Sequence, residues 1–415
     1  MKQAISLVLF LALSLWTADA SAHSKGHHKY KGGLHPHAAA ELKKANVDKY
    51  VGKFKPAVSA PVGDGWIKHT YDPGASFDGP ICIAGSPYSV FSRKRNPKKL
   101  LIMLQGGGAC WQGFYNCNVF SESQEPPPPP AGIWDDESGL NPLDDWSIVY
   151  LPYCDGSVFT GDNDVPDAEW QATVEAILGL PAGDGPPARF HRGLRNVTAG
   201  IDLAKHEFPR ARKILVAGSS AGGVGATAFA PFLTRMTFGN RSRLIVFNDA
   251  GPVAINLADT GAIAARAADW QFAQFYPKSC KECDAFGQTT ALIKWRLRND
   301  RTIREAFYST DFDTTNRFFM NLLPTVPPED PAYQTQFLLT GLAYRDLVIS
   351  EHGEINELFP RRYRRFIRAE SFTHTALQTP DFYESANGVP LYDWLDAFVY
   401  KKRSWKDIVE ELPAP

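Results

Sequence analysis

The chain has 415 residues, of which 44% are hydrophobic and 21% are charged, and its formal net charge is -1. This is the composition of a globular protein that is long enough to bury a large core. The near-neutral charge gives no electrostatic reason to expect a nucleic acid or an anionic membrane surface as partner. The strongly basic classes of binding protein are therefore excluded.

The first 22 residues have the pattern of a secretory signal peptide. Lys2 supplies the positive end, residues 5–16 are apolar, and Ala20-Ser21-Ala22 is a small-residue cleavage site. An uncleaved anchor is the alternative, but the apolar run is shorter than the roughly 20 residues that span a bilayer. We expect cleavage near Ala22, export of the mature protein to an extracellular or periplasmic space, and no stable membrane anchor.

Two segments of biased composition stand out after the signal. Residues 23–55 are rich in His and Lys, which predicts a flexible N-terminal arm; metal binding by its histidines is the alternative. Residues 56–415 are then expected to form a single catalytic domain. A run of five prolines, Pro126–Pro130, predicts a stiff surface segment near Cys117.

The chain contains six cysteines, and export would place them in an oxidising compartment. Six cysteines allow 15 pairings, and closeness in sequence favours one of them. It joins Cys110 with Cys117, Cys280 with Cys283, and Cys82 with Cys154. The Cys280–Cys283 spacing could also be half of a zinc site or a redox motif, but no second CxxC or histidine pair completes such a set, so a structural disulfide is favoured.

Short apolar runs alternate with segments of helix length along the rest of the chain. Runs of this kind, apolar on both faces, are typical of buried parallel strands. They cover residues 100–104, 146–151, 213–217, 243–247 and 305–309. Residues 193–208 between two of them carry apolar side chains at helical spacing. The pattern predicts a three-layer α/β fold with a mainly parallel central sheet and long loop insertions.

The third run leads directly into Gly218-Ser219-Ser220-Ala221-Gly222. A GxSxG sequence between a strand and a helix of small residues is the nucleophile elbow of α/β-hydrolases, in which the central serine lies on a strained turn with its hydroxyl exposed. Ser219 is the rival hydroxyl, but only Ser220 has a glycine two residues away on both sides. The alternative is a glycine turn that only packs a helix on a sheet. We predict an α/β-hydrolase-like fold with Ser220 as nucleophile.

The first run ends in Gln105-Gly106-Gly107-Gly108-Ala109. Esterases use a glycine-rich turn after an early strand because bare backbone N–H groups can approach the substrate carbonyl oxygen. The predicted oxyanion hole consists of the N–H groups of Gly107, Gly108 and Ala221. A phosphate-binding loop is the weaker alternative, since no Lys-Ser or Lys-Thr follows the glycines.

In this fold the acid and the base follow the serine in that order along the chain. Two histidines remain downstream, and His374, in a loop-like stretch near the C-terminus, is favoured over His352, which lies among polar residues and is expected at the surface. The fifth strand leads to Asp311 and Asp313, which local sequence cannot separate. Asp249 follows an earlier strand and could be a structural or orienting residue.

Several blocks resemble the pectin acetylesterase and Notum family of carboxylesterases. The most specific block is Tyr153–Asp162, because no general physical rule demands its sequence. The others are Leu104–Cys110, His191-Arg192-Gly193, Gly218–Gly223 and Asp249-Ala250-Gly251. Together they cover about residues 65–380 in the family's order. The chain departs from the family at Gln105, where Glu is usual, and at Ala109, where Trp is usual. The family's cysteines near the histidine are absent, and the proline run has no counterpart.

This resemblance implies a catalytic triad of Ser220, Asp313 and His374, and so favours Asp313 over Asp311. It also implies a secreted serine carboxylesterase that needs no metal or organic cofactor. The expected substrate is an acylated polysaccharide such as pectin, which the enzyme would deacetylate. Ala109 in place of Trp leaves room for the alternative of longer-chain or polymeric esters. A non-catalytic secreted binding protein on a hydrolase scaffold is the alternative from another class.

Overall fold

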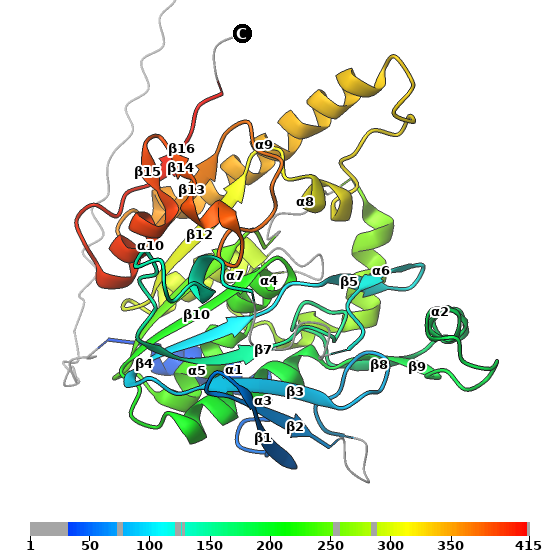
Figure 1. Cartoon of the computed structure of the whole chain (residues 1–415), viewed down its shortest axis with the longest axis horizontal. Coiled ribbons are helices and arrows are strands. Elements are labelled where there is room, and N and C mark those ends of the chain that lie inside the picture. Colours follow the sequence, from blue (N-terminus) through cyan, green and yellow to red (C-terminus); the bar gives the residue numbers. More distant parts are fainter. Residues whose placement is uncertain are drawn as a thin grey trace, which may run out of the picture. The chain divides into compact units, whose positions relative to one another are not determined.

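Ten strands form one central sheet in the computed structural model (Figure 1), which describes residues 32–72, 78–120, 126, 129–251, 258–283 and 289–412. In spatial order they are β1 (Val58–Gly63), β2 (Trp66–Tyr71), β3 (Tyr88–Arg93), β7 (Trp146–Leu151), β4 (Asn96–Leu104), β10 (Lys213–Ser219), β11 (Arg243–Asp249), β12 (Arg304–Thr310), β13 (Tyr363–Arg368) and β16 (Ile408–Val409). The strands from β7 to β16 are parallel, whereas β1, β2 and β3 are antiparallel to their neighbours. All five predicted strands lie in the parallel part.

The apolar runs of these strands fill two separate cores, one on each face of the sheet. In β4, Leu100, Ile102 and Leu104 pack into one core, and the alternate residues Leu101 and Met103 pack into the other. Because successive side chains of a strand point to opposite faces, a run that is apolar throughout requires cover on both sides. The sheet therefore lies between two layers, as the three-layer prediction states.

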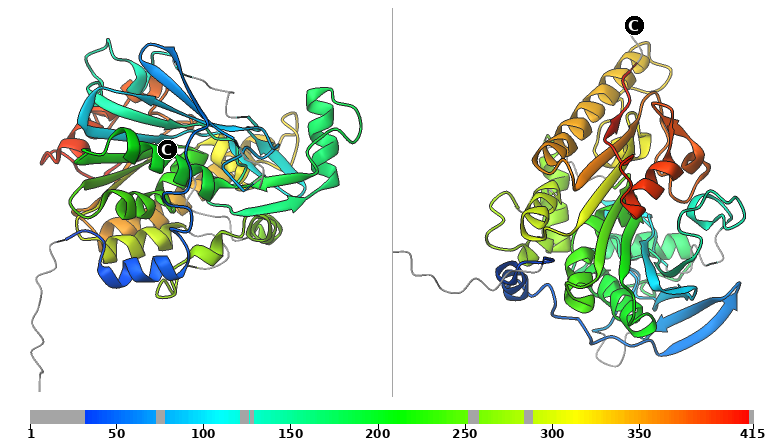
Figure 2. Two further views of the ribbon diagram at one scale, coloured as in Figure 1. Left: turned by 90° about the horizontal axis from the view of Figure 1, so that it is seen from below. Right: turned by 90° about the vertical axis from the view of Figure 1, so that its left-hand side faces the viewer.

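Helices supply that cover. They are α1 (Pro36–Lys44), α2 (Ala168–Leu178), α3 (Gly193–Glu207), α4 (Ala221–Thr227), α5 (Ala230–Phe238), α6 (Thr260–Trp270), α7 (Thr289–Asn299), α8 (Thr314–Phe319), α9 (Tyr333–Leu358) and α10 (Leu391–Tyr400). The larger core contains residues of α3, α5, α7 and α9, and the other contains the apolar face of α10. The right-hand view of Figure 2 shows α9 and α10 on opposite sides of the strands.

Short elements extend the carboxyl ends of the strands and form the predicted loop insertions. They include the hairpins β5 (Gly108–Trp111)/β6 (Phe114–Cys117), β8 (Asn163–Pro166)/β9 (Ala188–His191) and β14 (Ser385–Ala386)/β15 (Val389–Pro390), with the 3-10 turns η2 (Gly132–Trp134), η3 (Phe272–Phe275) and η4 (Pro380–Tyr383). The three predicted disulfides are confirmed: Cys82–Cys154, Cys110–Cys117 and Cys280–Cys283. The second of these closes the β5/β6 hairpin next to the glycine turn.

The predicted flexible arm, residues 23–55, differs from the structure over its described part. The chain from residue 32 onward forms one compact unit. Leu34, Ala38 and Leu42 are buried in the larger core, and the His35 N–H donates to the Asn299 carbonyl at 2.8 Å. The polar composition of the segment hid these apolar positions, of which Ala38 and Leu42 lie one turn apart on the buried face of α1 and Leu34 precedes the helix. Residues 23–31, like the predicted signal peptide, lie outside the described residues.

Two of the five residues of the proline run, 127 and 128, also lie outside the described residues. Pro129 and Pro130 are exposed, as predicted for a surface segment, whereas Pro126 is buried. Within the described ranges, no helix is long and apolar enough to cross a membrane.

Candidate active site

Ser220 lies on the turn between β10 and α4. It has φ 55° and ψ −123°, a strained backbone conformation for a residue with a side chain. Its N–H donates to the Asp249 carbonyl at 2.8 Å, and the N–H of Gly223 donates to the Ser220 carbonyl. A Cβ on Gly218 would lie 2.1 Å from the Gly222 carbonyl oxygen, so the turn closes only with glycine there. This is the geometry predicted for a nucleophile elbow.

The glycine turn after β4 packs directly against Ser220. Leu104 pairs with Gly218 in the parallel sheet, and a Cβ on Gly106 would lie 2.9 Å from the Ser220 Cβ. Two cavities meet at Ser220: Gly107 and Gly108 line one of them together with this serine, and Ala221 lines the other. Ala221 is also the first residue of α4, where a helix leaves N–H groups without an intrahelical partner. The structure thus brings the three predicted oxyanion residues around one serine.

Hydrogen bonds from the Tyr153–Asp162 block hold the glycine turn in place. The buried Asp155 carboxylate accepts hydrogen bonds from the Ser157 N–H at 2.8 Å and the Ser157 hydroxyl at 2.6 Å. The loop held in this way offers the Gly156 carbonyl to the Cys110 N–H at 2.8 Å. Gln105, which replaces the usual Glu, accepts from the Tyr153 N–H through its amide oxygen at 2.9 Å, as a carboxylate would. The block therefore fixes the glycine turn and the β5/β6 hairpin.

His374 and Asp313 form a close pair. His374 Nδ1 lies 2.7 Å from Asp313 Oδ2, and the Asp313 side chain is fully buried. A carboxylate at this position makes Nδ1 the protonated nitrogen, so that Nε2 carries the free lone pair. His374 Nε2 has no hydrogen-bond partner in the described part of the chain, and His374 lines the same cavity as Ser220. An unprotonated nitrogen is thus available in the cavity that contains the serine hydroxyl.

Asn316 is a residue of this site that the sequence analysis missed. Asp313 caps the N-terminus of α8 by accepting the Asn316 N–H at 2.8 Å, and the Asn316 side-chain amide donates to Asp313 Oδ2 at 2.9 Å. The same amide also donates to the Ala250 carbonyl at 3.0 Å, which connects the acid to the end of β11. The signal in the sequence is an Asp at a helix N-cap with Asn three residues later.

Asp311 and His352, the rivals of Asp313 and His374, have other partners. Asp311 forms an ion pair with Arg345 at 2.9 Å and accepts the Ser371 N–H at 3.2 Å. His352 was expected at the surface, and this prediction is wrong. Its side chain is fully buried and stacks on Phe307 with ring centroids 3.6 Å apart, because it lies on the inward face of α9. Burial lowers the pKa of His352 to about 3, which keeps the imidazole neutral.

Ser219 and Asp249 connect the elbow to the segment that carries His374, residues 371–379, which we call the histidine loop. The buried Ser219 hydroxyl donates to Asp249 Oδ2 at 2.6 Å. The Asp249 carboxylate also accepts the N–H groups of Ala376 at 2.9 Å and Leu377 at 3.0 Å. Burial raises the pKa of Asp249 to about 6. The Ser219 hydroxyl is therefore engaged in a hydrogen bond. Asp249 orients the histidine loop, and an orienting role is one of the two that the sequence analysis left open for it.

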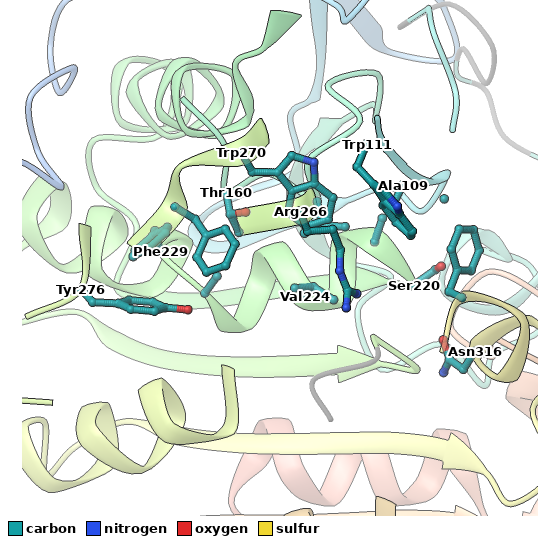
Figure 3. Close-up of a pocket in the computed structure, with 16 residues that line it drawn as sticks. Ala109, Trp111, Thr160, Ser220, Val224, Phe229, Arg266, Trp270, Tyr276 and Asn316 are labelled. Carbon is teal, nitrogen blue, oxygen red and sulfur yellow. The ribbon is translucent and has the colours of Figure 1, made fainter. Parts of the chain in front are cut away.

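Two cavities meet at Ser220, and they differ in character. The first, which we call the aromatic cavity, has a volume of about 820 Å³ with the space at its mouth included. Figure 3 shows its side chains extending from Ser220 to Tyr276. Its walls come from the β5/β6 hairpin, α4, α6 and η3, and include Ala109, Trp111, Val224, Phe229, Arg266, Trp270 and Phe272. The sequence signal for these walls is the run of aromatic residues between 270 and 276.

The second cavity, which we call the polar cavity, is larger and more open. Its volume is about 1620 Å³ with open solvent included. It contains the glycine turn and His374, together with amides and hydroxyls from distant segments, among them Asn116, Asn118, Thr375 and Gln378. In the described residues, no group of three or more His, Cys, Asp or Glu side chains is placed to hold a metal ion.

The residues that form this site also carry the sequence signature of a known family. A sequence model of the family described as pectinacetylesterase matches residues 67–263. Over this span, just under half of its length, the chain is similar to the pectinacetylesterase family. The match includes the glycine turn, the Tyr153–Asp162 block and Ser220, and it supports a carboxylesterase or deacetylase activity. It ends before Asp313 and His374, which the structure alone brings to the serine. The predicted resemblance is confirmed.

A comparison of folds leads to the same architecture. The structure is similar to that of the Wnt deacylase Notum from Drosophila, with a TM-score of 0.55 and 17% sequence identity, over 80% of this chain and 93% of that chain. At this identity the likeness shows the fold, and it confirms the predicted α/β-hydrolase-like class. No curated protein sequence matches the chain.

Proposed function

We propose that this protein is an exported serine carboxylesterase of the pectinacetylesterase family, and that it hydrolyses its substrate through an acyl-enzyme. The observation that carries the proposal is the paired His374 and Asp313. Their 2.7 Å contact orients an imidazole whose other nitrogen has no partner in the described chain and lines the cavity of Ser220. The strained turn at Ser220 and the glycine turn beside it supply the remaining parts of an acyl-transfer site.

In the first half of the reaction, the Ser220 hydroxyl attacks the ester carbonyl while His374 Nε2 takes its proton. The N–H groups of Gly107, Gly108 and Ala221 stabilise the negative oxygen of the tetrahedral intermediate. Asp313 stabilises the imidazolium that forms. His374 then gives this proton to the leaving alcohol, and the acyl group remains on Ser220. In the second half, water replaces the alcohol: His374 takes a proton from it, the acid leaves, and the proton returns to Ser220.

The two cavities suggest where the parts of the ester bind. His374 must protonate the leaving alcohol, and it lines the polar cavity, so the alcohol part belongs there. Amides and hydroxyls around this open cavity are suited to a hydroxyl-rich alcohol such as a polysaccharide. The acyl part then lies in the aromatic cavity. Deacetylation of a polysaccharide such as pectin is the substrate class that the family suggests.

The lining of the aromatic cavity favours a second candidate, an ester with a longer acyl chain. Aromatic and aliphatic side chains line this cavity from Ser220 to Tyr276 (Figure 3), and such a lining suits an apolar chain. Ala109, which stands where the family usually has Trp, is part of this lining. Rates on acetyl, butyryl and octanoyl esters of one alcohol distinguish the two candidates, because only a short-acyl enzyme loses rate steadily along the series.

Export rests on two observations. The first is the predicted signal peptide. The second is the three disulfides, which persist in oxidising compartments and are rare in a reducing cytosol. Determining the N-terminal sequence of the protein recovered from the culture medium or periplasm tests cleavage near Ala22. A protein that retains residues 1–22 after export contradicts the proposal.

The catalytic assignment is tested by replacing the nucleophile. We expect Ser220→Ala to lower turnover of p-nitrophenyl acetate by at least ~10³-fold, as losses of a triad member do in serine hydrolases. A fluorophosphonate probe should label the wild-type protein and not this variant. Ser404→Ala, which removes an exposed hydroxyl elsewhere, is the matched control. Failure of the probe to label the wild-type protein would instead favour a non-catalytic binding protein on a hydrolase scaffold.

A further inference from the structure

Arg266 is the one charged side chain among the described residues that line the aromatic cavity. This residue is on α6, one helical turn before Trp270, so both side chains point from the same face of the helix. Both line the cavity that contains Ser220. Figure 3 shows the Arg266 guanidinium pointing into this cavity, toward the part between Val224 and Ser220.

The helix that carries Arg266 is firmly anchored. The indole N–H of Trp270 donates to the Cys110 carbonyl at 2.8 Å, and the Asp269 carboxylate accepts the Gln112 N–H at 2.7 Å. Asp269 also forms an ion pair with the buried Arg189 at 2.6 Å. These contacts join the end of α6 to the disulfide-closed hairpin. The position of Arg266 next to the nucleophile is therefore set by the fold and not by a freely moving surface segment.

The partly buried guanidinium of Arg266 lacks the carboxylate partner that two arginines of the interior have. Arg235 and Arg296, each almost fully buried, form ion pairs with Asp300 and Glu305. In the part of the chain that the structure describes, Arg266 forms no ion pair, and its one hydrogen bond runs from Nε to the Ala262 carbonyl at 3.1 Å. Burial lowers the pKa of Arg266, and the carboxylate of Asp259 acts against this shift. A cation placed in an apolar cavity in this way is stabilised by a bound anion.

The geometry also indicates which part of an ester would carry that anion. His374, which must protonate the leaving alcohol, lines the polar cavity, and Arg266 lines the aromatic one. The residues that line both cavities are Ser220, the oxyanion residue Gly108 and Phe319. An acyl group bound to Ser220 and directed away from His374 therefore extends toward Arg266.

We propose that Arg266 binds a carboxylate on the acyl group, so that the enzyme selects half-esters of dicarboxylic acids over neutral esters of the same size. The inference rests on the proposed serine esterase function and specifies its substrate class. The planar guanidinium can donate two parallel hydrogen bonds to a carboxylate. The ring of Trp111, whose centroid lies 5.3 Å from the guanidinium carbon, supports the side chain from one face. Arg266 is a specificity residue in this scheme and takes no part in proton transfer.

Three esters of matched size test the inference. The first is the 4-nitrophenyl half-ester of adipic acid, with the carboxylate on the acyl group. The second is 4-nitrophenyl 6-methylheptanoate, its neutral isostere. The third is 4-(hexanoyloxy)benzoate, with the carboxylate on the alcohol. We expect Arg266→Met to lower the ratio of kcat/KM for the first ester to that for the second by ~10- to 100-fold, the range for a lost hydrogen bond to a charged group. Most of the change should be in KM.

Two variants serve as controls. Arg266→Lys keeps the charge without the planar fork and should fall between the wild type and Arg266→Met. Arg210→Met removes an exposed arginine that precedes β10, at the edge of the sheet opposite Ser220, and should leave the ratio unchanged. An unchanged ratio in Arg266→Met overturns the inference. A loss of activity by Arg266→Met on the ester with the carboxylate on the alcohol, in place of a loss on the half-ester of adipic acid, also overturns the inference.

A binding measurement separates this inference from the proposed function. Calorimetry with monoethyl adipate is carried out on Ser220→Ala, which holds the ester without turning it over. Adding Arg266→Met to this variant should weaken binding by ~10-fold or more. Equal binding by the two proteins overturns the inference even if the enzyme is a serine esterase. If the wild-type protein hydrolyses none of the three esters and resists the fluorophosphonate probe, the proposed function fails, and the calorimetric result still decides the role of Arg266.

Discussion

The aromatic cavity and the histidine loop both meet Ser220, but they are held in place by different interactions. The cavity walls are apolar side chains on elements joined by a disulfide and by ring contacts, such as Trp111 stacked on Phe114 with centroids 4.2 Å apart. The histidine loop buries Ala376 and Leu377 in the core on the other face of the sheet, but hydrogen bonds fix its backbone and its imidazole. Three buried carboxylates hold it, because Asp249, Asp311 and Asp313 accept hydrogen bonds from its backbone or its imidazole.

This difference separates two properties of the site. Packed walls determine which acyl group fits, so substitutions there should change the ratio of rates between substrates. Hydrogen bonds to the loop determine where the imidazole lies, and small displacements of a catalytic group reduce turnover for every substrate. The predictions that follow test this division, beginning with the largest effect.

The strongest test compares the two aspartates that follow β12. Asp313→Asn should lower kcat by ~10³- to 10⁴-fold on every ester, because the amide favours the wrong imidazole tautomer. Asp311→Asn should instead lower the free energy of unfolding by about 3 kcal/mol, since it disrupts the buried pair with Arg345. We expect its kcat to fall by less than ~10-fold. Steady-state kinetics and urea unfolding measure both quantities, and the reverse pattern would show that Asp311 is the triad acid.

A second test concerns Asp249, which holds the loop from the side of the elbow. Asp249→Asn keeps the shape of the side chain but replaces an acceptor oxygen by a donor. We expect kcat to fall by ~10- to 100-fold with little change in KM, since Ala376 and Leu377 lose part of their anchor and His374 moves with them. A change confined to one substrate would contradict a role in positioning the base.

Because the pKa of Asp249 is raised, comparison with Asp249→Asn also tests how the free energy of unfolding depends on pH. Its pKa is about 6 in the folded protein and about 3.9 when unfolded, so the folded state binds the proton more tightly. The stability that this proton confers is present below pH 4 and is lost as the pH rises through 6. Relative to Asp249→Asn, the wild type should lose up to ~3 kcal/mol between pH 4 and pH 7. Urea unfolding at both pH values measures the difference.

The sequence predicts the parts of this molecule that depend on local pattern. The five central strands are continuous apolar runs, and the elbow is a short motif between two of them. The antiparallel strands β1, β2 and β3 lack such runs, since β1 is mostly exposed and β2 alternates with partly exposed residues. His352 was misplaced because its neighbours in sequence are polar, whereas on α9 it shares a face with Val348 and Ile355.

The choice between Asp311 and Asp313 shows a different limit. Both follow the same strand, and nothing local distinguishes them. Their partners come from segments about 30 to 60 residues away, Arg345 on α9 for one and His374 for the other. The cavity containing Arg266 likewise combines five segments that lie between residues 108 and 319. The choice of acid and the lining of the cavity depend on which distant segments pack together. No local pattern in the sequence therefore predicts them.

The last prediction concerns the aromatic cavity and should have the smallest effect on the reaction as a whole. Ala109 is nearly fully buried on β5 and lines this cavity beside Ser220. Ala109→Trp places an indole where the acyl chain is expected, so kcat/KM for an octanoyl ester should fall by ~10- to 100-fold, whereas that for the acetyl ester should change by less than ~3-fold. Ala109→Ser, which keeps the volume, is the control. Equal losses on both esters would show that the hairpin, like the histidine loop, acts on the rate and not on the choice of acyl group.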